Sequence, residues 1–498
     1  MRGLLLLIST LAVLAVTSRS QITRTVGRLQ EVFAWKQITF NINGNDITQD
    51  RYGDDDLDMT RDKRQAGSVF FNNDDDDAVR NWNQTSQNKR NNRPNNRPRP
   101  MWGNWPTTSS TTTPTPSDEA GRFFIQYNNL PMGVERVDNR LFITLPRRRY
   151  GIPSTLNYLD LTRDSNTRSP GLRPYPNLRD SRALTSVYRT RADSCNRLWM
   201  VDTGLLEIPN DRQQVRQPAV VVYDLRTDRQ ILRYELKSTD IIAANTPTGL
   251  ASITLDIVDD CANTFAYIPD LATYGLIVYS LRDNDSWRLT HNYFSFNPIA
   301  GNLRLAGQRF QWSDGIFSVT LTEPRGGCSS AYFHAMVGTH EFSVSSCVLR
   351  NRTASQDPNF WSQFSEVGDR GANSQSTMHG YHAGTRVVFF ADIGRDAISC
   401  WNTAAALTPA AVEILAKDST RLSYPSDLHV TGDEVWVMAN SLPTWAYSRL
   451  DTNEYNFFIY KANVQDLISG TVCAGRGRVR VNTRTGTDKE ENNNTTTT

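Results

Sequence analysis

The sequence predicts an all-β protein, built as a six-bladed β-propeller. A short apolar run centred on an aromatic residue recurs six times, and most copies end near an acid, a glycine or an asparagine. Repeats of this length are a signature of propellers and related arrays. The six aromatic anchors are Phe142, Trp199, Tyr267, Phe333, Phe389 and Trp436, separated by 57, 68, 66, 56 and 47 residues.

A second and a third apolar segment accompany each of the last five copies. The preceding segments are Leu184–Arg189, Leu250–Ile257, Asp314–Leu321, Met378–His382 and Ser426–Val430. The following segments are Val220–Leu225, Tyr274–Leu281, Glu341–Leu349, Ala397–Trp401 and Thr444–Leu450. Their length and their β-branched and aromatic content predict strands. Because one small sheet cannot bury both of its faces, we expect six sheets packed around an axis. A pair of irregular β-sandwiches is the alternative.

Composition divides the chain into five segments. Residues 1–20 combine Arg2, an apolar core and small residues, which predicts a secretory signal peptide. Residues 21–40 hold one expected strand, Glu31–Phe40, which would close the propeller by pairing with the last repeat. Residues 41–120 are rich in Asn, Asp, Arg, Pro and Thr and poor in apolar residues, so we expect an insertion that is disordered. The propeller then spans 121–473, and 474–498 form a disordered polar tail.

Charge gives little guidance about partners. The formal net charge is +2, which favours neither nucleic acid nor a membrane surface as a partner. Arg61–Arg64 resembles a proprotein-convertase site, although such runs are also common by chance in charged disordered segments. The triplet Arg147–Arg149 is interpreted as a solvated loop rather than an anion site.

Six cysteines, an even number, indicate an oxidising compartment. Cys195 and Cys261 precede the second strands of neighbouring repeats, and Cys328 and Cys347 flank a hairpin. Cys400 and Cys473 would then tie the last segment to the fifth repeat. We therefore expect these three disulfides, with free buried thiols as the alternative. No Cys-x-x-Cys pair is present, so a structural zinc site has little support. Expected glycosylation sites are Asn83, Asn284 and Asn351.

Several motifs resemble those of the insect yellow / major royal jelly protein family. They are DSCNRLWMVDTG (193–204), NTFAYIPDLATYGLIVYSL (263–281), FQWSDGIF (310–317), FSVSSCVLRN (342–351) and SCWNT (399–403). The resemblance implies a secreted six-bladed propeller with roles in pigmentation, cuticle or eggshell. It also implies capture of small aromatic amines in some members and dopachrome conversion in others. The polar insertion and the Cys328/Cys347 pair depart from the common pattern and put the subfamily in doubt.

No recognised nucleophile, zinc-protease or phosphate-binding motif occurs, so we expect no cofactor and no metal. The six histidines are dispersed. His379 and His382 are three residues apart on one expected strand and should point to opposite faces, which argues against a two-histidine metal site. The candidate catalytic residues are His340, His379 and Asp427.

A ligand is expected near the axis, where the first strand of each repeat begins. The residues at these starts are Ser186, Thr248, Ser252, Asp314, His379, Ser426 and Asp427. Asp314 and Asp427 are also explained by turn capping. The family resemblance associates the region of Thr339, His340 and Phe342 with amine capture, through ring stacking, cation–π contact and hydrogen bonds. The candidate ligand-binding residues are Asp314, Phe317, Thr339, His340, Phe342 and Asp427.

Three functions compete. The sequence favours a secreted, extracellular, non-enzymatic protein that binds small aromatic or amine ligands, or matrix, eggshell or cuticle proteins. A dopachrome tautomerase is the alternative, because moving a proton between ring positions needs only one His or carboxylate with a near-neutral pKa. A calcium-dependent lactonase-like hydrolase is the third, although it would need several oxygen ligands that converge on one ion. Fold alone does not decide among them.

Overall fold

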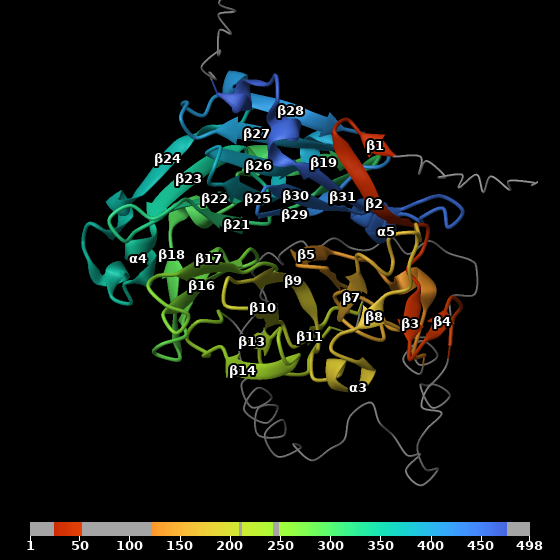
Figure 1. Ribbon diagram of the computed structural model, residues 1–498. Coiled ribbons are helices and arrows are strands. Elements are labelled where there is room, and N and C mark those ends of the chain that lie inside the picture. Colours follow the sequence, from red (N-terminus) through yellow and green to blue (C-terminus); the bar gives the residue numbers. More distant parts are fainter. Residues whose placement is uncertain (1–23, 52–121, 209–211, 243–248, 476–498) are drawn as a thin grey trace, which may run out of the picture.

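The six aromatic anchors lie in the second strands of six sheets, and each is at most 1% exposed. The computed structural model describes residues 24–51, 122–208, 212–242 and 249–475. Within them the chain forms a six-bladed β-propeller, as the repeats predicted (Figure 1). The signal peptide, Arg61–Arg64, Asn83 and Thr248 lie outside the described residues.

Each blade is an antiparallel sheet whose first strand lies nearest the axis. Blade 1 is β5 (Gly133–Val137), β6 (Arg140–Thr144), β7 (Leu156–Asp160) and β8 (Arg173–Pro174). Blade 2 is β9 (Val187–Ala192), β10 (Arg197–Asp202), β13 (Ala219–Asp224) and β14 (Arg229–Glu235). Blade 3 is β15 (Thr254–Ile257), β16 (Thr264–Asp270), β17 (Gly275–Ser280) and β18 (Asp285–Thr290). Blade 4 is β21 (Ile316–Leu321), β22 (Ser330–Ala335), β23 (His340–Ser345) and β24 (Phe364–Asp369). Blade 5 is β25 (Ser376–His382), β26 (Val387–Asp392), β27 (Ala397–Asn402) and β28 (Val412–Lys417).

Blade 6 joins the two ends of the propeller. It consists of β29 (Pro425–Thr431), β30 (Glu434–Ala439), β31 (Phe457–Asn463) and the N-terminal β2 (Leu29–Trp35), edged by β1 (Thr25–Val26). β2 pairs antiparallel with β31, for example Phe33 with Ile459, so the N-terminal strand closes the ring (Figure 1). The last blade thus takes three strands from the end of the chain and one from its beginning.

The N-terminal segment differs in detail from the expectation. The strand expected over Glu31–Phe40 stops at Trp35, and Phe40–Ile42 forms β3, which pairs with β4 (Asn45–Ile47). Residues 41–51, expected to be disordered, are ordered because Ile42 and Ile47 are at most 1% exposed and Arg51 pairs with Phe124. Two apolar side chains on a tight turn thus anchor a stretch that its composition marked as polar.

The third strand of blade 6 was also misplaced. Thr444–Leu450, expected to be a strand, overlaps helix α5 (Leu442–Tyr447), and the strand is β31. Pro443 sits in the first turn of α5, where proline is compatible with a helix. The apolar run at the start of β31, Phe457–Tyr460, is buried.

Short elements decorate the blades. The remaining hairpins are β11 (Leu205–Leu206) with β12 (Gln213–Gln214), and β19 (Asn302–Leu305) with β20 (Gln308–Gln311). The other described α-helices are α3 (Leu178–Ser181), α4 (Ser346–Arg350) and α6 (Val464–Ile468). The described 3₁₀ turns are η2 (Gln126–Asn128), η3 (Asn292–Phe294), η4 (Pro298–Ala300), η5 (Ala354–Gln356), η6 (Phe360–Gln363), η7 (Ile393–Arg395), η8 (Pro409–Ala411) and η9 (Val472–Ala474).

Three disulfides, Cys195–Cys261, Cys328–Cys347 and Cys400–Cys473, join the cysteines in the pairs that the strand frame predicted. The first connects blades 2 and 3, the second lies within blade 4, and the third ties η9 to β27 of blade 5. Asn284 and Asn351 are both exposed. No helix among the described residues is long and apolar enough to cross a bilayer.

The end of β10 shows how a blade is held. Trp199 is fully buried, and Asp202 accepts hydrogen bonds from the backbone N–H groups of Thr185, Ser186 and Gly204. Gly204 has φ of +63°, and a Cβ there would lie 2.1 Å from the carbonyl oxygen of Arg216. This stretch is therefore packing core and turn.

We predict that Trp35→Ala destabilises the protein by about 3–5 kcal/mol, the usual cost of deleting a buried aromatic side chain. Trp35 is fully buried in β2, and its indole N–H donates to the carbonyl oxygen of Pro170 at 2.9 Å. Chemical denaturation would measure the loss. Trp361→Ala is the matched control, because Trp361 is 54% exposed. Equal losses in both variants would contradict the role of β2 in ring closure.

Candidate functional site

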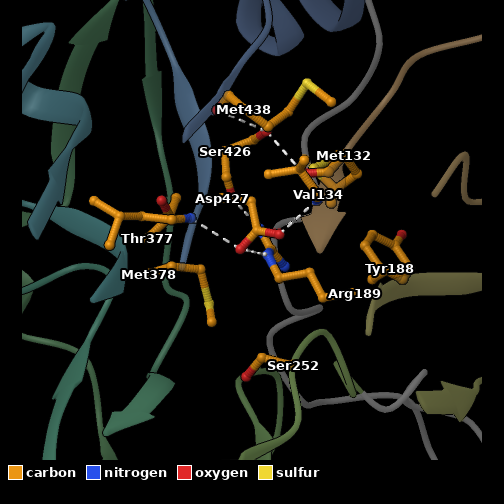
Figure 2. Close-up of polar contacts among 12 residues, drawn as sticks. Met132, Val134, Tyr188, Arg189, Ser252, Thr377, Met378, Ser426, Asp427 and Met438 are labelled. Carbon is orange, nitrogen blue, oxygen red and sulfur yellow. Dashed lines mark hydrogen bonds and ion pairs between the residues drawn. The ribbon is translucent and has the colours of Figure 1, made fainter. Parts of the chain in front are cut away.

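The innermost strands are linked to one another near the axis by hydroxyl groups. Ser252 Oγ donates to the carbonyl oxygen of Phe317 at 2.6 Å, which joins blade 3 to blade 4. Ser426 Oγ donates to the carbonyl oxygen of Met132 at 2.8 Å, which joins blade 6 to blade 1 (Figure 2). The expected strand-start residues Ser252 and Ser426 therefore hold blades together.

Asp427 is a structural acid and not a turn cap. It lies within β29 and is fully buried. Its Oδ2 accepts the backbone N–H of Val134 at 2.8 Å, and its Oδ1 lies 3.4 Å from Arg189 Nε (Figure 2). Its Oδ2 also lies 3.2 Å from His429 Nε2. Burial raises the pKa of Asp427, but His429 and Arg189 outweigh this effect and hold the pKa below its ordinary value. The carboxylate thus joins blades 6, 1 and 2.

Arg189 completes this link. It is 3% exposed and donates to the carbonyl oxygens of Ala251, at 2.8 Å, and Ser426. Its guanidinium also lies 4.9 Å from the ring centroid of Phe317, another candidate ligand residue. Phe317 and Asp427 therefore contact the same buried arginine.

Around the first residues of the innermost strands lies a second group of ionisable side chains, all partly exposed except the buried Tyr424. We call it the axial cluster: Arg148, Tyr188, Glu207, Asp314, Tyr424 and Tyr447. Arg148 Nε lies 3.2 Å from Glu207 Oε2, and the Tyr188 hydroxyl donates to the same oxygen. Tyr447 accepts a hydrogen bond from Trp312 Nε1 at 2.8 Å. The cluster therefore combines one cation, two carboxyl groups and three phenols.

Asp314 is the unusual acid of the axial cluster. It immediately precedes Gly315 and β21, and its side chain is half-buried. Burial is the largest cause that raises the pKa of Asp314 to about 7, with Arg148 lowering it and Glu207 raising it. A carboxyl group with a near-neutral pKa can accept or donate a proton at physiological pH.

The pKa values of two phenols and of the arginine in the axial cluster are also raised. Burial is the main cause that raises the pKa of Tyr424 and of Tyr447. Burial lowers the pKa of Arg148, but Tyr188 and Glu207 outweigh it, so this pKa is raised. At neutral pH the cluster thus offers neutral phenol donors and a fixed positive charge.

The basic triplet is not the solvated loop that was expected. Arg147 donates to the carbonyl oxygens of Ile152, Leu184 and Thr185, and burial lowers its pKa to about 10. Arg149 stacks over Trp445, 3.7 Å from the ring centroid. Arg147 and Arg149 therefore pack against neighbouring residues, and Arg148 belongs to the axial cluster.

Thr339, His340 and Phe342 lie on the third strand of blade 4 or just before it. His340 Nδ1 lies 2.6 Å from Glu366 Oε1, and its side chain is 40% exposed. Phe342 stacks on Tyr293 with ring centroids 4.2 Å apart. Asp369 and His340 are neighbours across β23 and β24, and Thr339 hydrogen-bonds with Asp369. These three residues contact partners other than those of Asp314 and Asp427.

His379 belongs to a third, fully buried cluster. His334 Nδ1 lies 3.1 Å from Glu341 Oε2, and His379 Nε2 lies 3.1 Å from Glu341 Oε1. Arg370 Nη1 donates to Glu341 at 2.5 Å. Burial lowers the pKa of His334 to about 4. For Glu341 burial acts to raise the pKa, but the two histidines outweigh it and the pKa is lowered. His382 instead contacts Thr385 and Asp433, so the two histidines of β25 face different partners, as their spacing predicted.

The model of the major royal jelly protein family matches residues 185–473. The chain belongs to the yellow / major royal jelly protein family. L-dopachrome tautomerase yellow-f of Drosophila melanogaster is 44% identical over 359 residues, which cover 70% of this chain and 83% of that protein. Dopaminechrome tautomerase of the same species is 36% identical over 368 residues, covering 70% and 78%.

Protein yellow of Drosophila melanogaster is 38% identical over 360 residues, which cover 70% of this chain and 65% of that protein. The match to each of these relatives covers 70% of this yellow-family chain. The resemblance inferred from the sequence motifs is therefore confirmed at the level of the family.

Sequence reasoning found Asp314 in this yellow-family protein but missed its neighbours. Glu207 follows β11, and Tyr424 precedes β29, so nothing in the local sequence connects them with Arg148. The calcium alternative also lacks support in the described residues. There the one group of three metal-capable side chains is His334, Glu341 and His379, which includes neither Asp314 nor Asp427.

We predict that Asp314→Asn raises thermal stability more at about pH 8 than at about pH 5. The folded protein retains the Asp314 proton up to about pH 7, whereas the unfolded chain loses it near pH 4. Because the folded state binds the extra proton, wild-type stability falls as the pH rises between these values. The asparagine variant lacks this titration, so its advantage should grow across the range and then level off.

Thermal denaturation at both pH values measures this difference. Asp466→Asn is the matched control, since Asp466 is exposed and lies on α6, away from the axial cluster. An Asp314→Asn advantage that is equal at the two pH values would show that the pKa of Asp314 is ordinary.

Proposed function

We propose that the axial cluster of this yellow-family protein binds a small aromatic ligand that carries ionised groups, outside the cell. The observation that carries the proposal is the association of Arg148, Glu207 and Asp314 with three phenols near the start of the innermost strands. An arginine suits a ligand carboxylate, and the two acids suit an ammonium or iminium group.

Aromatic side chains beside these charges favour a flat ligand. Phe310 stacks on Tyr447 with centroids 4.6 Å apart, and Trp312 lies edge-on to Tyr424 at 6.3 Å. Rings of this kind stack on an aromatic ligand and attract its cationic group. An aryl-ethylamine or an aminochrome combines both features.

Three disulfides support an oxidising, extracellular compartment. Pigment, cuticle and eggshell are the settings to which the family resemblance pointed. Binding to matrix, cuticle or eggshell proteins stays a prediction of the sequence, with the polar insertion of residues 41–120 as its basis.

A second candidate is the tautomerisation of an aminochrome. Two relatives, at 44% and 36% identity, are named as an L-dopachrome tautomerase and a dopaminechrome tautomerase. The near-neutral pKa of Asp314 supplies the base that such a proton transfer needs. The Asp314 carboxylate would take a proton from a ring carbon and release it to solvent. The quinone oxygen would take up one proton from solvent while a tyrosine hydroxyl hydrogen-bonds to it. Substrate and product are isomers, so the step needs no oxidant or reductant.

We predict that Asp314→Asn lowers aminochrome turnover by roughly 10²–10⁴-fold, the usual contribution of a positioned acid or base. In the wild-type protein kcat/KM should rise with pH through about 7, because the base must be ionised. Absorbance assays with L-dopachrome and dopaminechrome measure both quantities against buffer. Asp466→Asn is again the control and should keep the wild-type rate.

Calorimetry with dopamine and L-dopachrome separates binding from catalysis. Arg148→Gln should weaken the binding of L-dopachrome more than the binding of dopamine, because only L-dopachrome carries a carboxylate. If ligands bind but turnover equals that in buffer, the protein is a binder and the tautomerase candidate fails. If neither ligand binds, the proposal for the axial cluster is wrong.

A further inference from the structure

The buried cluster of blades 4 and 5 gathers three side chains that can ligate a metal. His334 lies on β22, Glu341 on β23 and His379 on β25, and all three side chains are fully buried. One nitrogen from each histidine and a Glu341 oxygen lie within 4.8 Å of one another. Neither the axial cluster nor the Asp427–Arg189 link uses these residues.

Two of these atoms have no hydrogen-bond partner. Glu341 Oε1 and His379 Nε2 lie 3.1 Å apart, yet neither forms a hydrogen bond of acceptable geometry. Buried polar atoms without partners are rare in proteins and are expensive to leave unsatisfied. The two atoms are therefore at ion-pair distance without the geometry of a hydrogen bond.

His334 presents a related mismatch. Its Nδ1 lies 3.1 Å from Glu341 Oε2, and its Nε2 lies 3.2 Å from the carbonyl oxygen of Thr377. Both neighbours are acceptors, whereas a neutral imidazole has one N–H to donate. If Nε2–H donates to Thr377, the lone pair of Nδ1 points at a carboxylate. A cation between Nδ1 and the carboxylate removes this conflict.

We propose that His334, Glu341 and His379 bind a divalent transition-metal ion, with zinc the best match to two imidazoles and one carboxylate. Two ligand atoms at about 2.1 Å from a tetrahedral zinc ion are roughly 3.4 Å apart. The two 3.1 Å separations between histidine nitrogens and Glu341 oxygens are close to this value. The ion would link β22 and β23 of blade 4 to β25 of blade 5.

The surrounding residues orient these ligands as outer-shell partners do in metal sites. Besides the Thr377 contact of His334, His379 Nδ1 lies 2.7 Å from Ser318 Oγ. Arg370 Nη1 donates to Glu341, and the carbonyl oxygens of Gly338, Ser374 and His340 accept the other Nη hydrogens. These carbonyl oxygens disperse the charge of Arg370, which limits its repulsion of a bound cation.

The test is metal analysis of the full-length secreted protein, purified without chelator. We expect about one zinc ion per chain, its loss after dialysis against a strong chelator, and a lower melting temperature that added zinc restores. Cobalt in its place should give the visible d–d absorption of a low-symmetry nitrogen–oxygen site. Ser318→Ala removes the hydroxyl that contacts the imidazole and the backbone N–H of His379 but no proposed ligand, so it should weaken zinc affinity roughly 10–100-fold in a folded protein.

His382→Asn is the matched control, because His382 also lies on β25 but contacts Thr385 and Asp433. It should keep wild-type metal content and zinc affinity. Protein that contains no metal, and whose melting temperature does not respond to zinc or cobalt, would overturn the proposal. The cluster would then be a buried ion pair between Arg370 and Glu341 that two histidines flank. Zinc binding that Ser318→Ala and His382→Asn weaken equally would place the ion elsewhere.

Discussion

The pairing of β2 with β31 is the interaction on which the rest of the structure depends. A propeller blade has an exposed edge and two apolar faces, so six blades are stable together only when the ring is complete. Here a strand from the start of the chain supplies the outer part of the last blade, and Trp35 packs within it. Hydrogen bonds from Arg168 and Ser169 to Glu31 and Ala34 tie this strand to blade 1 as well.

Ring closure brings the innermost strands together, and buried polar contacts then set their spacing. Serine and threonine hydroxyls bond to carbonyl oxygens of the next blade, and Asp427 with Arg189 spans three blades. Such contacts are satisfied only in one arrangement, so they specify how the blades meet. They also explain why several polar residues near the axis are unavailable to a ligand.

The axial cluster differs from these links because all its side chains except Tyr424 are partly exposed and because it holds one arginine but two carboxyl groups. Among the described residues the Asp314 side chain forms no hydrogen bond, and this leaves its pKa to burial and to two charged neighbours. The same burial that destabilises an ionised carboxylate makes it a usable base near neutral pH. The proposed chemistry and the expected loss of stability at high pH thus have one physical origin.

The sequence by itself determined the six-fold repeat, the aromatic anchors, the pairing of the cysteines and the family. Each of these is written in local patterns or in equivalent positions of successive repeats. Only the tertiary structure decided which polar residues meet. Asp427 reads locally as a turn residue but pairs with Arg189, 238 positions away, and Glu341 meets His334 and His379 from other strands. Contacts between blades depend on how the six sheets pack around the axis, and the order of strands along the chain does not predict that packing.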